Sequence, residues 1–409
     1  MRRLTLILIF SISAYIVSGQ NNTNSPYSIF GIGELEHTDG GRNMGLGGTG
    51  MALRSNIFLN LSNPASLTSL PAQSMATDAG INFKYSNLQN STNSVNVLNG
   101  NISWAALAFP INRRLSFGFT LNPKSNVGYK IYSTKSLDGT TLSYPVTYSG
   151  QGGLTEASAS IGALVNKRLS IGLRSSLLWG NMSKTGIDLP PMGSSITRID
   201  NVSYVGLTVK PGFQFHSKIS EKTLLTIGGT AELSSYLNGT SNLSIASGSS
   251  VVLTEVNRQD QLKLPFQGGL GFALEFNSKY LFTADYSRSD YRQAQVNLDV
   301  KGLALNESYH VGLELAPKYD VQRLGQTIRY RIGAMYQSGY LNVYGVQISS
   351  YAATAGVSLP IRRDRNSINL SLEIGQQGSN KNQLILETYS KLNISFCLWE
   401  RWFIPRKYD

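Results

Sequence analysis

Hydrophobic and polar residues alternate with a period of two along most of the chain, in segments about ten residues long that end at turn residues. In Leu169–Leu178 most of the aliphatic side chains share one parity, and Arg174 lies on the other parity among serine and glycine. A period of two indicates a β-strand with one apolar and one polar face. We predict such strands at Thr77–Leu88, Asn101–Phe109, Arg114–Asn122, Thr155–Asn166, Arg168–Trp179, Asn201–His216, Lys222–Leu237, Gln261–Phe276, Lys279–Ser287, Ser308–Lys318, Thr327–Gln337, Tyr351–Pro360, Asn366–Gln376 and Leu384–Leu398.

The connections between these strands alternate between short turns and long loops. Short turns such as Pro110–Arg113 and Asn166–Arg168 are rich in Arg and Lys. We predict long loops at Pro123–Leu154, Gly180–Asp200, Asn238–Asp260 and Arg288–Asn306. This alternation is typical of outer-membrane barrels, which have short periplasmic turns and long extracellular loops. The predicted fold is therefore all-β, a transmembrane antiparallel β-barrel of about 14 strands.

The first nineteen residues have the features of a signal peptide. Arg2 and Arg3 precede the apolar run Leu4–Val17, and small residues at 17–19 provide a cleavage site before Gln20. The apolar run is too short to cross a membrane as a helix, which takes about 20 residues. We therefore predict export through a cleaved signal peptide, with the cell outer membrane of a Gram-negative bacterium as the destination.

Residues 20–76 lack a sustained strand period although they contain many apolar residues and glycines. A free linker would be more polar, so we predict a compact plug inside the barrel over 20–76, with the barrel itself over 77–409. Gly45, Gly47 and Gly50 match the spacing of a dinucleotide-binding loop, but neither a strand nor a helix pattern flanks them. We instead expect these glycines to provide unusual backbone angles and close approach.

Charged residues recur on the polar faces of the predicted strands. On a barrel they face the lumen, because Arg or Lys on the lipid face costs about 2–4 kcal/mol at mid-bilayer. Both signs occur in similar number, which predicts pairing inside a partly filled lumen. The predicted lumen charges are Arg174, Lys210, Glu232, Glu275, Asp285, Glu314, Arg329, Arg331, Glu373 and Lys391.

Aromatic residues lie near the ends of several predicted strands, where the membrane–water interface favours them. We predict interfacial girdles from Tyr280, Tyr286, Tyr330, Tyr336, Trp399 and Trp402.

Composition narrows the function classes. The formal net charge is +12, but Lys and Arg are spread along the chain, so we predict no nucleic-acid binding. Cys397 is the one cysteine and is expected to be buried and inert. His37, His216 and His310 lack metal-ligand spacing and a nucleophile context, so we predict no metal, no cofactor and no enzyme activity. For His310 we expect a hydrogen bond in the lumen.

The stretch Gly45-Leu-Gly-Gly-Thr-Gly-Met-Ala52, with Gly48 and Gly50 inside it, precedes Asn63-Pro64-Ala65. This arrangement resembles the FadL family of outer-membrane channels for hydrophobic compounds, and SPYSIFGIGEL at 25–35 is most similar to Bacteroidetes-type members. The resemblance implies an N-terminal hatch containing Gly45, Gly47, Gly48, Gly50, Asn63, Pro64 and Ala65. It also implies a wall opening where one strand kinks inward, for which Pro211-Gly212 is the candidate, with an ordinary bulge as the alternative.

Two functions remain open from the sequence. The first is passive uptake of hydrophobic small molecules, a long-chain fatty acid or similar, gated by the hatch. The second is a non-transport barrel that is a partner or shuttle subunit of a secretion or surface-attachment complex, similar to type 9 secretion. The expected partners are outer-membrane lipid or lipopolysaccharide, a hydrophobic ligand, and other outer-membrane or secretion proteins.

Overall fold

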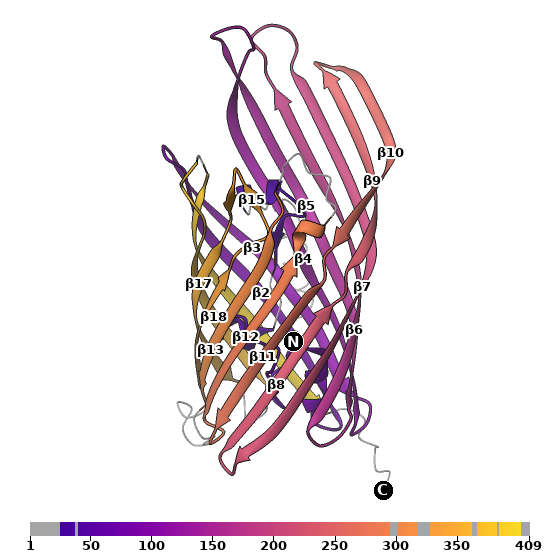
Figure 1. Ribbon diagram of the computed structural model, residues 1–409, viewed down its shortest axis with the longest axis vertical. Coiled ribbons are helices and arrows are strands. Elements are labelled where there is room, and N and C mark those ends of the chain that lie inside the picture. Colours follow the sequence, from indigo (N-terminus) through magenta and orange to yellow (C-terminus); the bar gives the residue numbers. More distant parts are fainter. Residues whose placement is uncertain are drawn as a thin grey trace, which may run out of the picture.

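The computed structural model describes residues 25–36, 40–294, 302–316, 328–361, 366–382 and 384–401. The predicted signal peptide, His37 and Trp402 lie outside these ranges. The chain forms a closed barrel of 14 antiparallel strands, as the alternating pattern predicts (Figure 1). Consecutive strands are neighbours in the barrel, and the last strand pairs with the first. The apolar faces of the strands point outward and the polar faces point into the lumen.

The barrel strands are long, and two of them are each interrupted once. β8 with β9, and β10 with β11, each make one barrel strand that breaks at 233–234 and 265–266. The barrel elements are β2 (Ser74–Gln89), β3 (Ser94–Pro110), β4 (Leu115–Ser136), β5 (Ser143–Leu164), β6 (Leu169–Asp188), β7 (Ile196–Ser220), β8 (Thr223–Glu232), β9 (Ser235–Ser247), β10 (Ser250–Leu264), β11 (Gln267–Phe276), β12 (Tyr280–Asp290), β13 (Leu305–Leu315), β14 (Arg329–Gln337), β17 (Ser350–Pro360), β18 (Ser367–Gly378) and β19 (Leu386–Arg401).

Short elements connect or line the barrel. They are η1 (Pro26–Ile29), β1 (Glu34–Leu35), α2 (Gly41–Met44), η2 (Pro64–Ser69), η3 (Tyr291–Gln293), β15 (Asn342–Val343) and β16 (Val346–Gln347). No helix in the described part of the chain is long and apolar enough to cross a membrane.

Three of the predicted long loops are wrong. Pro123–Leu154, Gly180–Asp200 and Asn238–Asp260 are occupied mainly by the ends of strands joined by short turns. These strands rise above the rest of the wall (Figure 1). Outside the membrane the outward face has no lipid to contact and does not need to be apolar, so the hydrophobic alternation fades while the hydrogen-bond ladder continues.

The outward face carries a row of aromatic residues on neighbouring strands. Tyr286, Tyr309, Tyr336 and Tyr351 are paired in register across β12, β13, β14 and β17. The rings of Tyr286 and Tyr309 lie 5.1 Å apart. The row has the arrangement of an interfacial girdle. Trp399 does not belong to such a girdle: it lies on the inward parity of β19 and is buried in an apolar core.

The interior has apolar layers at two levels, with a charged region between them. The upper layer includes Tyr27, Tyr129, Tyr340 and residues of the connections above the barrel. The lower layer includes Met44, Leu67 and Trp104. Residues before β2, such as Tyr27 and Met44, contribute to both layers.

The wall is not hydrogen-bonded over its whole height. β3 and β4 pair only from Pro110–Ser116 up to Ala105–Leu121. Above this point β4 shifts register around Lys124 and pairs instead with β1. The hydrogen-bond ladder of the wall is therefore interrupted between β3 and the upper part of β4, and we call this interruption the wall opening.

Candidate functional site

The candidate functional region is the contact between the N-terminal segment, residues 25–36 and 40–73, and the inward faces of the barrel strands. The glycine motif makes the closest approach to the wall. Gly47 has a positive φ of 68°, and a Cβ there would lie 2.6–2.7 Å from carbonyl oxygens of Ala334 and Val311. Its N–H donates to Thr354 Oγ1 (2.9 Å), and its carbonyl accepts from His310 Nδ1 (2.6 Å). Gly47 thus has the unusual backbone angle and close approach expected of these glycines, and His310 makes a hydrogen bond to it.

Gly45 and Gly50 of the motif also contact the wall. Gly45 packs on Gly356, where a Cβ would come within 3.1 Å of the neighbouring Cα. Gly48 has a positive φ of 79°. Gly50 N–H donates to Asp285 Oδ2 (2.6 Å). Because a backbone N–H bonded to a carboxylate is a strong hydrogen bond, Asp285 holds this turn against β12.

The Asn63-Pro64-Ala65 motif packs on the wall formed by β6 and β7. Asn63 Oδ1 accepts from Ala65 N–H (3.0 Å) and caps η2, while its Nδ2 donates to Phe213 O (2.9 Å). A Cβ on Gly172 would lie 2.4 Å from backbone atoms of Pro64 and Ala65. The segment therefore lies directly on strand backbone, which only glycine permits at this distance.

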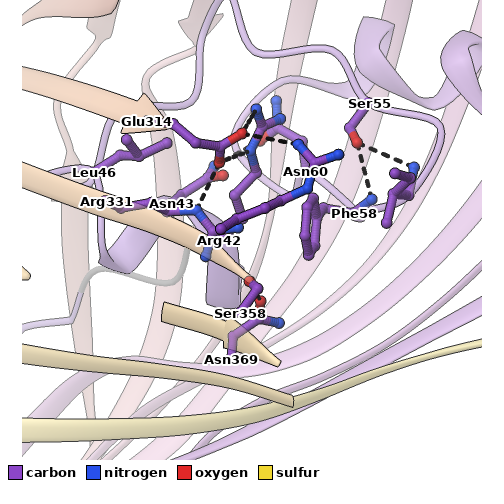
Figure 2. A network of polar contacts seen from close by, with 12 residues as sticks. Arg42, Asn43, Leu46, Ser55, Phe58, Asn60, Glu314, Arg331, Ser358 and Asn369 are labelled. Atoms are coloured by element: carbon purple, nitrogen blue, oxygen red, sulfur yellow. Dashed lines mark hydrogen bonds and ion pairs between the residues drawn. The ribbon is translucent and has the colours of Figure 1, made fainter. Parts of the chain in front are cut away.

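A buried cluster of charges joins the segment to β13 and β14 (Figure 2). Glu314 accepts two hydrogen bonds from Arg42, each 2.9 Å long, and one of 2.6 Å from Arg331 Nε. Arg329 lies 3.2 Å from the same carboxylate. The three guanidinium groups lie 4.9–5.6 Å from the centre of the Phe58 ring. One carboxylate thus holds three arginines from two parts of the chain, and Phe58 adds cation–π contacts.

Arg54 anchors the segment at a second point, through neutral groups. It donates to Ser170 Oγ (2.7 Å), Gln214 Oε1 (3.0 Å) and Thr68 Oγ1 (3.0 Å). Burial lowers the pKa of Arg54 to about 10. Arg54 remains charged at neutral pH, and its hydrogen bonds compensate for part of its desolvation.

The charged region between the apolar layers surrounds two small chambers. The first chamber, of about 110 Å³, is lined by Asn99 and Asn101 of β3 and by the β1 residues beside the wall opening. The second, of about 140 Å³, is lined by charged residues that include Lys124 and Glu232. Each has the volume of a few water molecules, since one water takes about 30 Å³.

Ion pairs around the chambers connect the segment to the strands. Lys84 contacts Glu34 (2.7 Å), and Lys391 contacts Glu36 (3.3 Å). Burial alone would raise the pKa of Glu36, but the positive charges of Lys391 and Lys84 outweigh burial and hold its pKa below the usual range. Both carboxylates come from the segment and both lysines from the wall, so these pairs bind the segment to β2 and β19.

All ten predicted lumen charges lie on inward-facing positions of their strands. Glu314, Arg329 and Arg331 meet in the arginine cluster, whereas Arg174, Lys210, Glu232 and Asp285 line the second chamber. Glu373 and Lys391 line the first. Glu275 lies on the inward parity of β11 near Arg329.

Pro211 and Gly212 lie in β7 and are in register with β6. On the other side the ladder of β7 is interrupted, because it pairs with β9 up to Gly206 and with β8 from Gly212. The largest loss of pairing lies elsewhere, between β3 and β4.

Sequence reasoning missed several residues of the site. Arg42 and Arg54 are charges in a glycine-rich apolar segment, and that contrast was the available signal. Lys84 lies on the polar parity of its strand, as the predicted lumen charges do. Lys124 enters the lumen through a local register shift, which has no clear sequence pattern.

Two further expectations concern possible reactive groups. Cys397 is fully buried, as predicted. Among the described residues no group of three or more His, Cys, Asp or Glu side chains is arranged to hold a metal ion.

Comparisons with known proteins agree with this geometry. A family model described as BamG matches residues 1–409. The fold is similar to a Pseudomonas aeruginosa FadL homologue (TM-score 0.61, 13% identity, 91% of this chain and 100% of that one). It is also similar to the toluene transporter TbuX of Ralstonia pickettii (TM-score 0.60, 14% identity, 90% of this chain and 99% of that one). A third similar structure is the toluene transporter TodX of Pseudomonas putida (TM-score 0.61, 16% identity, 91% of this chain and 100% of that one). No curated protein matches the sequence.

Proposed function

This chain belongs to the BamG family, and from its fold and its wall opening we propose that it is an outer-membrane channel for passive uptake of hydrophobic small molecules. The N-terminal segment is its hatch, and the structure is the closed state. The proposal rests on the FadL-like fold together with the opening between β3 and β4, which lies beside the first chamber. The class of ligand is that of a long-chain fatty acid or a compound of similar polarity.

The interior supports a route that begins at the outer face. The upper layer is apolar and includes Tyr27 and Tyr340, whose hydroxyls bond to Ile385 O and Gly33 O, both at 2.6 Å. Entry into such a layer costs an apolar ligand little free energy. Below it the chambers are small and charged, so the hatch has to move before a ligand can reach the wall opening.

Uptake by cells tests the proposal. The protein is expressed in a Gram-negative strain without a channel of this fold, and uptake of radiolabelled oleic acid and toluene is measured. We expect cells that express the wild-type protein to take up more of both compounds than cells without the protein. Asn101→Trp, which fills the chamber beside the opening, is expected to lower uptake about tenfold by steric block.

Asn96→Trp is the matched control, because Asn96 is exposed on the same strand near the hairpin turn. It should transport like the wild type. Equal uptake by cells with and without the wild-type protein, at equal amounts of folded barrel, would overturn the channel proposal.

A second candidate is a non-transport partner subunit of a secretion or surface-attachment complex. The observation that favours it is the group of strands that continues above the rest of the wall. On β10 of this group Val251, Val252 and Val256 are 65%, 68% and 65% exposed. Exposed aliphatic residues outside the lipid belt are typical of a protein contact surface. Absence of uptake in the experiment above would favour this candidate.

The barrel fold supports a location in the outer membrane, with lipid and lipopolysaccharide around the apolar outer face. We retain from the sequence the proposals that a signal peptide over 1–19 is cleaved and that the chain is a Bacteroidetes-type member.

A further inference from the structure

The lipid-facing wall contains an apolar groove of about 880 Å³. It follows two neighbouring rows of paired residues from β5 across β6, β7, β8 and β11 to β12. Five inter-strand spacings of about 4.8 Å give a length of about 24 Å. Because barrel strands tilt by about 35–45°, the groove runs obliquely across the apolar belt.

Small residues at outward positions form the floor of the groove. Pro211, Gly229, Ala231 and Gly268 occupy positions where other parts of the belt carry large aliphatic or aromatic side chains. Larger side chains such as Leu270, which is 60% exposed, form its sides.

The floor is supported from inside the barrel. Behind β6 and β7, Pro64 and Asn63 pack on Gly172 and Gly212. Behind β8 and β11, Met51 packs on inward-facing glycines, with its backbone against Gly228. The wall cannot move inward to close the groove, so the groove is preformed.

We propose that this groove is a binding site for one acyl chain of a membrane lipid. Its surface is hydrocarbon apart from Thr230 and the Tyr286 hydroxyl, and it opens toward the lipid side of the barrel. Half of a hydrocarbon core of about 30 Å is about 15 Å, so the groove is long enough for an acyl chain to lie along it. An unfilled groove would leave apolar surface without contacts. The site differs from the lumen and from the β3/β4 opening, and it does not depend on transport.

Photo-crosslinking tests the site. The probe is a phosphatidylethanolamine that carries a diazirine on one acyl chain, in vesicles of phosphatidylethanolamine and phosphatidylglycerol that contain the full-length barrel. We expect peptides that include Pro211 and Gly268 to be labelled about fivefold more than the outward face of β17. Ala231→Leu fills the floor and should abolish this excess.

Ala353→Leu is the matched control, since Ala353 is exposed on the outward face of β17 and the same atoms are added. It should leave the excess unchanged. Correct folding of both variants is checked by heat-dependent mobility on gels. Equal labelling around the belt, or an excess that persists in folded Ala231→Leu, would overturn the proposal whether or not the protein transports.

Discussion

Glu314→Gln is expected to release the N-terminal segment from β13 and β14. The carboxylate is 4% exposed and holds Arg42 and Arg331 at 2.6–2.9 Å. Glutamine leaves three guanidinium groups without their negative partner, of which those of Arg42 and Arg331 are buried. Breaking a buried charge pair costs about 3–5 kcal/mol. Trypsin should then cut after Arg42 and Arg54 in the folded barrel, measured by mass spectrometry.

Glu221→Gln controls for the loss of one carboxylate, because Glu221 is exposed in the turn between β7 and β8. Its segment should remain protected from trypsin. If Arg42 is as well protected from trypsin in the Glu314→Gln variant as in the wild type, the cluster does not hold the segment.

Gly172→Val should displace the Asn63-Pro64-Ala65 motif from the wall. A Cβ at position 172 would lie 2.4 Å from the Pro64 carbonyl carbon and the Ala65 nitrogen. These are backbone atoms with little freedom to move, so overpacking of about 1–3 kcal/mol or more is expected. We expect a lower unfolding temperature in detergent and faster trypsin cleavage after Arg54.

Gly186→Val makes the same substitution on the same strand where there is space. The nearest atoms to a Cβ at Gly186 are those of the Tyr148 ring, at 3.5 Å. This variant should keep the wild-type unfolding temperature and cleavage rate. Equal behaviour of the two variants would mean that the segment does not pack on Gly172.

The sequence predicted the barrel well because each strand contacts lipid on one face and a polar interior on the other. That contrast produces the period of two and predicts the strand number. It fails above the membrane, where β4 and β5 continue through the predicted loop Pro123–Leu154. It also fails at Trp399, whose position near the chain end suggested an interface but whose parity on β19 directs it inward.

Sequence reasoning found the candidate site only in part. The glycine motif was identified because glycines permit close backbone approach, and Asn63 was identified through the resemblance of its motif to the FadL family. The partners of Glu314 were not predictable, since Arg42 and Glu314 are separated by 272 positions. The β3/β4 opening depends on a register shift at Lys124 and on pairing with a two-residue strand. Neither feature changes the hydrophobic pattern.

The central claim is that the N-terminal segment closes the channel and has to move for uptake. A disulfide between position 41 and position 395 tests it, because a Cβ on Gly41 would lie 2.8 Å from the Ser395 Cβ. A disulfide needs about 3.5–4.5 Å between these atoms, so a small local shift permits the bond. Gly41→Cys with Ser395→Cys is made in a Cys397→Ser background, with each single variant as a control.

Uptake of radiolabelled oleic acid is then measured in cells before and after oxidation, and again after reduction. The account predicts that the oxidised double variant loses uptake, that reduction restores it, and that the single variants do not respond. Undiminished uptake by fully cross-linked protein would contradict the account, because the segment would then not be the gate.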